Sequence, residues 1–171
     1  MKTFKVLSFA LFLIFAVTLA ASAQSIVFAS LDGDKIDVEA QKGKVVVMAI
    51  GASWLPLSND QADTINKLAK RYSGKEVAFY FIATDSASEK SKNYASDDDI
   101  RKFVKRNKLN VTILRDSEGK TSVQKYKLDQ LPAFIILDKT GKPDGDAISG
   151  IDPLDEIDTA EILSRRIDKL L

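Results

Sequence analysis

The amino-acid sequence predicts an α/β fold, in which a central mixed β-sheet is flanked by helices. Three uninterrupted apolar runs, residues 45–50, 77–83 and 133–137, are typical of strands that are buried on both faces. Segments with helical spacing of apolar residues alternate with these runs, and this alternation is typical of sheets with parallel strands. Two consecutive strands near the C-terminus predict an antiparallel pair at one edge.

The remaining elements follow in order along the chain. Residues 25–38 are expected to form two short strands, a hairpin extension around the turn signal Asp32-Gly33-Asp34. The other predicted strands are 111–114 and a last short one near 147–150, after a turn at 138–141. The predicted helices are 59–72, one opened by 96–99, a short one over 119–126, and a last one starting at Asp152-Pro153.

Two of these helices carry recognisable start signals. Ser58 with Gln61 resembles a capping box, so we expect Ser58 to cap the helix over 59–72. Ser96 followed by the acidic residues 97–99 suits the positive end of a helix dipole. The alternative for 97–99 is a calcium site, but the spaced oxygen ligands of a calcium loop are missing. We interpret the Lys/Arg run at 101–108 as a solvated helix face.

Composition excludes several classes of function. The 171 residues contain 25 Lys+Arg and 24 Asp+Glu, a formal net charge of +1, which argues against a nucleic-acid partner. The chain has no Cys and no His. It therefore holds no disulfide, thiolate nucleophile, Cys/His metal site or imidazole-dependent triad. No phosphate-binding glycine motif is present, so we expect neither metal nor cofactor. Carboxylate-pair hydrolysis is the one common enzyme mechanism still permitted, and no acidic pair is singled out.

The first 23 residues predict a secretory signal. Lys2 and Lys5 precede the mostly apolar stretch 6–20, and Ala21-Ser22-Ala23 fits a small-x-small cleavage site. An uncleaved anchor is the alternative, but the apolar run is short for a membrane span. Cleavage leaves residues 24–171 as a single domain. The 25 basic residues less Lys2 and Lys5 leave 23 against 24 acidic ones, a mature charge of −1.

Several short motifs resemble, in their order and spacing, the thioredoxin-like proteins. Within them the chain is similar to the exported TlpA/ResA-like, redoxin (AhpC/TSA-related) branch, and the resemblance implies a thioredoxin-like three-layer sandwich. The matching pieces are Gly43-Lys44-Val45-Val46-Val47, Gly51-Ala52-Ser53-Trp54-Leu55-Pro56-Leu57-Ser58, Thr84-Asp85, Leu114-Arg115-Asp116 with Gly119-Lys120, Leu131-Pro132-Ala133-Phe134 and Asp138-Lys139-Thr140-Gly141.

The redox motif of that family is replaced in this chain. Where the family has Trp-Cys-Pro-x-Cys, the sequence reads Trp54-Leu55-Pro56-Leu57-Ser58, so Leu55 and Ser58 stand at the two cysteine positions. In the family the first thiol lies at a helix N-terminus, where the dipole lowers its pKa. Leu55 has no ionisable atom, and Ser58 without a base is a poor nucleophile. Thiol–disulfide exchange and cysteine-based peroxide reduction are therefore impossible.

The binding surface of the family does not depend on the thiols. Pro132 matches its cis-proline, beside which the family pairs with an extended client chain by strand addition. The resemblance implies that Trp54, Leu55 and Leu57 lie near the surface, where they would form a docking patch. In the alternative, the two leucines fold inward and cover the position of the missing thiols. The partner-binding residues predicted in this way are Trp54, Leu55, Pro56, Leu57, Leu131 and Pro132.

The sequence thus predicts an exported, redox-inactive binding protein rather than an enzyme. Its expected partner is another envelope protein or an extended polypeptide, with no nucleic acid and no membrane contact after signal cleavage. The expected compartment is the bacterial periplasm or the medium. Two alternatives remain open: an accessory subunit of a cysteine-bearing thiol–disulfide oxidoreductase, and an unrelated carboxylate enzyme. The sequence names no particular partner and no oligomeric state.

Overall fold

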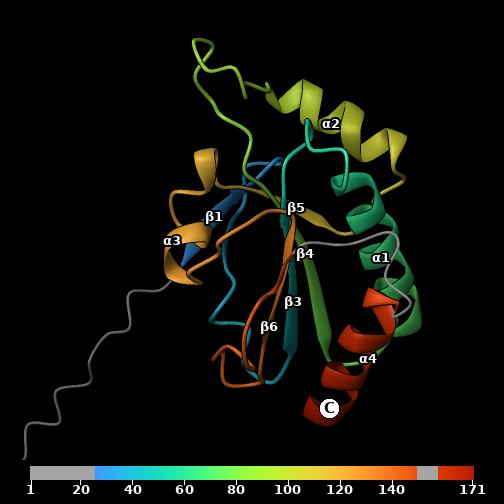
Figure 1. The fold of residues 1–171 in the computed structure, drawn as a ribbon. Helices are drawn as coiled ribbons and strands as arrows, with labels where there is room; N and C mark the ends of the chain where they lie inside the picture. The colour runs from blue at the N-terminus through green and yellow to red at the C-terminus, as the bar shows by residue number, and fades with distance from the viewer. Residues whose placement is uncertain (1–25, 150–157) are drawn as a thin grey trace, which may run out of the picture.

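The computed structural model describes residues 26–149 and 158–171, which build a seven-stranded mixed sheet flanked by helices (Figure 1). Across the sheet the strand order is β2-β1-β5-β4-β3-β6-β7. The strands are β1 (Val27–Ser30), β2 (Lys35–Asp37), β3 (Val45–Gly51), β4 (Val77–Ala83), β5 (Thr112–Arg115), β6 (Ala133–Leu137) and β7 (Ile148–Ser149). The helices are α1 (Ser58–Arg71), α2 (Asp97–Arg106), α3 (Ser122–Lys125) and α4 (Thr159–Leu170), with a 3-10 turn at Ser117–Gly119.

The sheet has a parallel centre and antiparallel margins. Strand β4 pairs in parallel with both β3 and β5, whereas β6 runs antiparallel to β3. The hairpins β1–β2 and β6–β7 form the two edges, which confirms the mixed sheet and its N-terminal hairpin extension. In this register Ile50 of β3 lies opposite Ile82 and Ala133. The carboxyl ends of β3 and β4 therefore meet the start of β6 at one end of the sheet.

Two apolar cores separate the three layers. Successive residues of a strand point to opposite faces, so Val45, Val47 and Ala49 join one core while Val46, Met48 and Ile50 join the other. Helices α1, α2 and α4 cover the first face and α3 lies against the second, to whose core the β1–β2 edge also contributes side chains (Figure 1). Both neighbouring layers bury β3 completely. The predicted thioredoxin-like sandwich is confirmed.

Part of the predicted organisation falls on residues that the structure does not describe. The predicted signal 1–23 lies outside the described residues, and so does the helix start at Asp152-Pro153. Helix α4 as described begins at Thr159, after Asp158, whose side chain accepts a 2.9 Å hydrogen bond from Ala160 N–H. No helix among residues 26–149 and 158–171 combines the length and apolar composition needed to cross a bilayer.

Helix α2 starts where the sequence predicts, and the structure shows that its start is a capping box. Ser96 Oγ accepts from Asp99 N–H at 3.2 Å, and Asp99 Oδ2 accepts from Ser96 N–H at 3.3 Å. Hydrogen bonds with Lys102, which has the larger effect, and with Ser96 lower the pKa of the Asp99 carboxyl to about 2. The acidic residues that open α2 therefore act as helix-start residues, and Asp99 is the one that closes the box.

Ser96→Ala should lower the free energy of unfolding by about 1 kcal/mol, because it leaves the backbone N–H of Asp99 without its acceptor. The pH dependence of the free energy of unfolding should report the contribution of Asp99 separately. Its folded-state pKa lies below the unfolded value of about 3.9, so its stabilising contribution is present above that value and is lost as pH falls toward 2. The free energy of unfolding, measured with urea between pH 2 and 6, should therefore depend less on pH in Asp99→Asn than in the native protein. A matching effect in the Asp98→Asn control would contradict this assignment.

Candidate functional site

The loop over residues 52–57 joins β3 to α1 through a series of tight turns. Leu55 N–H donates to Ala52 C=O at 3.1 Å, and Ser58 N–H donates to Leu55 C=O at 3.0 Å. These bonds use only backbone atoms at Leu55, so they place no demand on the side chain there. The loop reaches α1 already wound in the direction of the helix.

The apolar side chains of this loop are unequally exposed. Trp54 exposes 50% of its surface and is one of four large exposed hydrophobic residues in the described part of the chain. Pro56 is also exposed, whereas Leu55 and Leu57 are half-buried. The structure thus places the two leucines between the alternatives of an open patch and an inward cover. Trp54 contributes the accessible apolar area.

The proline segment lies beside the same loop. The Leu131–Pro132 peptide bond is cis. Pro132 is buried and Leu131 is half-buried. Because Ala133 pairs with Ile50, Pro132 lies next to the position where β3 passes into the loop. The structure therefore brings together both groups of residues that the sequence assigned to the binding surface.

A buried glutamine ties these two segments to α1. Gln61 is fully buried, and its Nε2 donates to Ile50 C=O at 3.2 Å and to Ala133 C=O at 2.8 Å. Its Oε1 accepts no hydrogen bond from the described residues. One side-chain amide therefore joins the end of β3, the start of β6 and the first turn of the helix.

The predicted helix cap at Ser58 is wrong. Ser58 lies inside α1 rather than at its cap, the cap position belongs to Leu57, and no side chain caps this end. The Ser58 hydroxyl is fully buried and accepts from Ala52 N–H at 3.3 Å. Gln61, the expected partner in a capping box, is committed to the two strands. Both side chains therefore make tertiary hydrogen bonds in place of the local capping box.

Two residues at the end of β4 fix the start of the loop. Thr84 donates to Gly51 C=O through its N–H at 2.8 Å and its Oγ1 at 3.0 Å. Asp85 is fully buried, and its carboxylate accepts from Ser53 N–H at 3.0 and 3.1 Å and from Ser53 Oγ at 2.6 Å. The residue before Trp54 is thereby held by three hydrogen bonds to one carboxylate.

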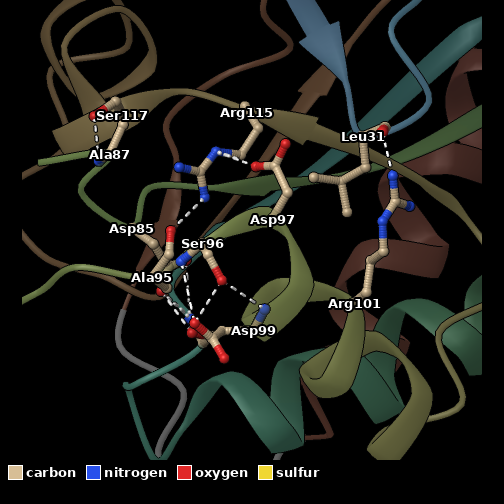
Figure 2. Close-up of polar contacts among 11 residues, drawn as sticks. Leu31, Asp85, Ala87, Ala95, Ser96, Asp97, Asp99, Arg101, Arg115 and Ser117 are labelled. Atoms are coloured by element: carbon tan, nitrogen blue, oxygen red, sulfur yellow. Dashed lines mark hydrogen bonds and ion pairs between the residues drawn. The ribbon is translucent and has the colours of Figure 1, made fainter. Parts of the chain in front are cut away.

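The segment after Asp85 is anchored to α2 and β5 (Figure 2). Arg115 of β5 donates to Ala95 C=O at 3.3 Å and pairs with Asp97 at 3.5 Å. Ala87 N–H donates to Ser117 Oγ at 3.0 Å. Among the described residues no group of three or more His, Cys, Asp or Glu side chains could hold a metal ion. Of the acidic residues at 97–99, Asp99 closes the capping box and Asp97 pairs with Arg115.

Sequence reasoning assigned no role to Ser53 and Asp85, and it expected Gln61 only as a capping-box partner of Ser58. Asp85 carries a usable signal, because it follows a buried strand with no cation beside it in the sequence. Such an acid is either exposed or held by backbone donors, and the structure shows the second case. Gln61 carries no comparable signal, because its partners lie 11 and 72 residues away along the chain.

The sequence is similar to those of known proteins. A sequence profile described as the AhpC/TSA family matches residues 19–142. A thiol-disulfide oxidoreductase ResA from Bacillus cereus is 27% identical over 120 residues, which are 70% of this chain and 64% of that protein. The chain thus matches somewhat less than two thirds of the length of this relative.

Solved structures show the same fold at lower identity. A secreted disulfide oxidoreductase of Mycobacterium tuberculosis, homologous to E. coli DsbE, gives a TM-score of 0.64 at 24% identity over 85% of this chain and 96% of that one. The exposed lipoprotein thioredoxin Etrx1 of Streptococcus pneumoniae gives 0.64 at 20% identity over 85% and 99%. These similarities concern the fold.

Asp85→Ala should lower the free energy of unfolding by about 2 kcal/mol, because it removes the charged acceptor of three hydrogen bonds. Asp85→Asn keeps one oxygen acceptor and should cost less. Trp54 is the only tryptophan, so its fluorescence anisotropy should fall as the loop loosens. Asp129→Ala, at an exposed acid outside the site, is the control. An anisotropy unchanged in Asp85→Ala would show that the carboxylate does not hold the loop.

Proposed function

The chain belongs to the AhpC/TSA family but contains no cysteine, and we propose that it is a redox-inactive thioredoxin-like protein that binds an extended polypeptide. The observation that supports this proposal is that the loop carrying the half-exposed Trp54 leaves β3 next to the cis-proline, since Ile50 pairs with Ala133. Neither Leu55 nor Ser58 supplies a thiol for disulfide exchange. In this proposal, the same end of the sheet binds a polypeptide without any thiol chemistry.

The expected mode of binding is strand addition beside Pro132. Within the described residues, neither N–H nor C=O of Leu131 makes a hydrogen bond. Main-chain groups of this kind can pair with an extended chain, and neighbouring apolar side chains then select its residues. Trp54 and the half-buried Leu55 and Leu57 favour a bound segment with apolar side chains, since aromatic anchors contribute strongly to interfaces.

The proposed site of action is outside the cytoplasm, in the bacterial periplasm or the medium. The predicted signal at residues 1–23 supports export. The secreted oxidoreductase of Mycobacterium tuberculosis, which shares the fold, is consistent with it. The proposed partner is therefore an exported polypeptide or another envelope protein.

Leu55→Asp/Leu57→Asp should abolish polypeptide binding, because two carboxylates would have to be desolvated under the bound chain. The measurement is the emission of Trp54 during titration with a tryptophan-free, permanently unfolded polypeptide. We expect a saturable change in the native protein and none in the variant. Val27→Asp/Leu171→Asp introduces the same charges at exposed apolar positions elsewhere and should bind normally. No response in the native protein, or equal responses in both variants, would refute the proposed site.

An accessory role in a thiol–disulfide system is the second candidate, favoured by the similarity to a ResA thiol-disulfide oxidoreductase. It would use the same surface on a cysteine-bearing partner. Crosslinking to envelope proteins, followed by identification of the partner, separates the two functions. An accessory protein should change the turnover of the captured oxidoreductase, whereas a polypeptide-binding protein should leave it unchanged.

Leu55→Cys/Ser58→Cys should create a redox-active disulfide on this scaffold. Positions 55 and 58 are joined by a backbone hydrogen bond of 3.0 Å at the start of α1, where the helix dipole lowers the pKa of a thiol. Insulin reduction in the presence of dithiothreitol should rise above background in the double variant alone. The single variants are the controls. A double variant that forms the disulfide but stays inactive would show that the surrounding site has lost more than its thiols.

A further inference from the structure

A hollow lies away from the loop that carries Trp54. It has a volume of about 650 Å³, within the range of about 300–1,000 Å³ typical of small-molecule sites. Its walls come from α2, the end of α1, the β1–β2 turn and the amino-terminal halves of β4 and β5. Trp54, by contrast, follows the carboxyl end of β3. The hollow is therefore independent of the surface proposed to bind polypeptide.

The floor of the hollow is an opening in the apolar core. Leu31, Phe79, Val104 and Val111 line it, and all four are only partly buried although they pack against the core under α1, α2 and α4. The turn between β1 and β2 and the end of α2 leave this part of the core uncovered. An apolar group entering here would remove already exposed hydrocarbon surface from water.

The rim of the hollow is positively charged. Arg101 and Lys105 line it, and an adjoining hollow of about 430 Å³, which shares Ala69 and Asn110, is lined by Lys70 and Lys108. Within the described residues no ion pair engages the three lysines. The carboxylate among the lining residues is that of Asp32, which pairs with Arg101 at 3.3 Å.

The position of the lysines has a partial explanation in the helices themselves. Cations are favoured at helix carboxyl ends, and Lys70 and Lys105 lie in the last turns of α1 and α2. Lys108 is different, because its backbone has φ of 51°, in the left-handed region that favours glycine. The dipoles also do not account for the apolar floor that these cations surround.

Polar contacts hold the walls in place. The Arg101 guanidinium donates to Leu31 C=O and so joins α2 to the β1–β2 turn (Figure 2). On the other side, Asn66 of α1 donates to Asn107 C=O at 3.1 Å and accepts from Asn110 N–H at 3.1 Å. The hollow is therefore formed before any ligand arrives, which reduces the entropy lost on binding.

We propose that this hollow binds a small amphipathic anion, an aliphatic chain with a carboxylate head. The chain lies against Phe79 and Val104, and the head lies at the rim near Lys105 and Lys108. An apolar floor and a rim of net positive charge are complementary to this chemistry and to neither a neutral hydrocarbon nor a cationic surfactant. The ligand is a dissolved molecule rather than a bilayer, because none of the large exposed apolar side chains, Val27, Trp54, Tyr94 and Leu171, lines the recess.

The test uses protein purified in the form that cells accumulate, labelled with nitrogen-15. Decanoate is titrated below its critical micelle concentration while amide resonances are followed. Acetate presents the head without the chain, and decyltrimethylammonium presents the chain with the opposite charge. Lys105→Gln/Lys108→Gln removes two rim charges, and Lys90→Gln/Lys92→Gln removes two exposed charges elsewhere.

Decanoate should give saturable shifts centred on Phe79, Val104 and residues 109–113, with neither control ligand doing so. The Lys105→Gln/Lys108→Gln variant should bind decanoate about three- to tenfold more weakly, as expected for two exposed ion pairs. The Lys90→Gln/Lys92→Gln control should bind like the native protein. The proposal is overturned by shifts centred on Trp54, by equal binding of decyltrimethylammonium, or by equal loss in both lysine variants. Absence of saturation overturns it, and so does sedimentation with phosphatidylglycerol vesicles without decanoate binding.

Discussion

A position with no room for a side chain, Gly51, organises the end of the sheet that carries the candidate site. A Cβ there would collide with Gln61 Oε1 and approach Ser58 Oγ to 2.7 Å. The Gly51 carbonyl accepts both hydrogen bonds from Thr84. The first turn of α1 can therefore approach the end of β3 this closely only because residue 51 is glycine. The direction of the loop that carries Trp54 follows from that approach.

The limits of prediction from sequence are clearest at the two helix starts. Ser58 with Gln61 and Ser96 with Asp99 have the same spacing, and only the second pair forms a capping box. Ser96 lies on a half-exposed turn where no distant group competes for its hydroxyl. At Ser58 the buried Ala52 N–H and the carbonyls of β3 and β6 bind the same side chains. Local pattern predicts a cap only where tertiary partners leave the side chain available.

The strands were predictable because burial on both faces leaves an apolar run in the sequence, and β4 coincides with its predicted residues 77–83. The nearness of the Trp54 loop to Pro132 was predictable only through the family resemblance. The two lie 78 residues apart along the chain, so no local pattern connects them. The hollow beside α2 was not predictable. It depends on the β1–β2 turn, α1, α2 and β5 meeting at one place, and the sequence of α2 alone indicates a solvated basic face.

The contacts that shape the candidate site separate its geometry from the chemistry of the family motif. At position 55 the loop is held through backbone atoms, so leucine can stand in place of cysteine. At position 58 a hydroxyl accepts from Ala52 N–H, a role that a thiol fills only weakly. Asp85 holds the residue before Trp54 without involving either position. Because none of these contacts needs a reactive sulfur, a chain without the two thiols loses disulfide exchange and keeps the contacts that hold this loop in place.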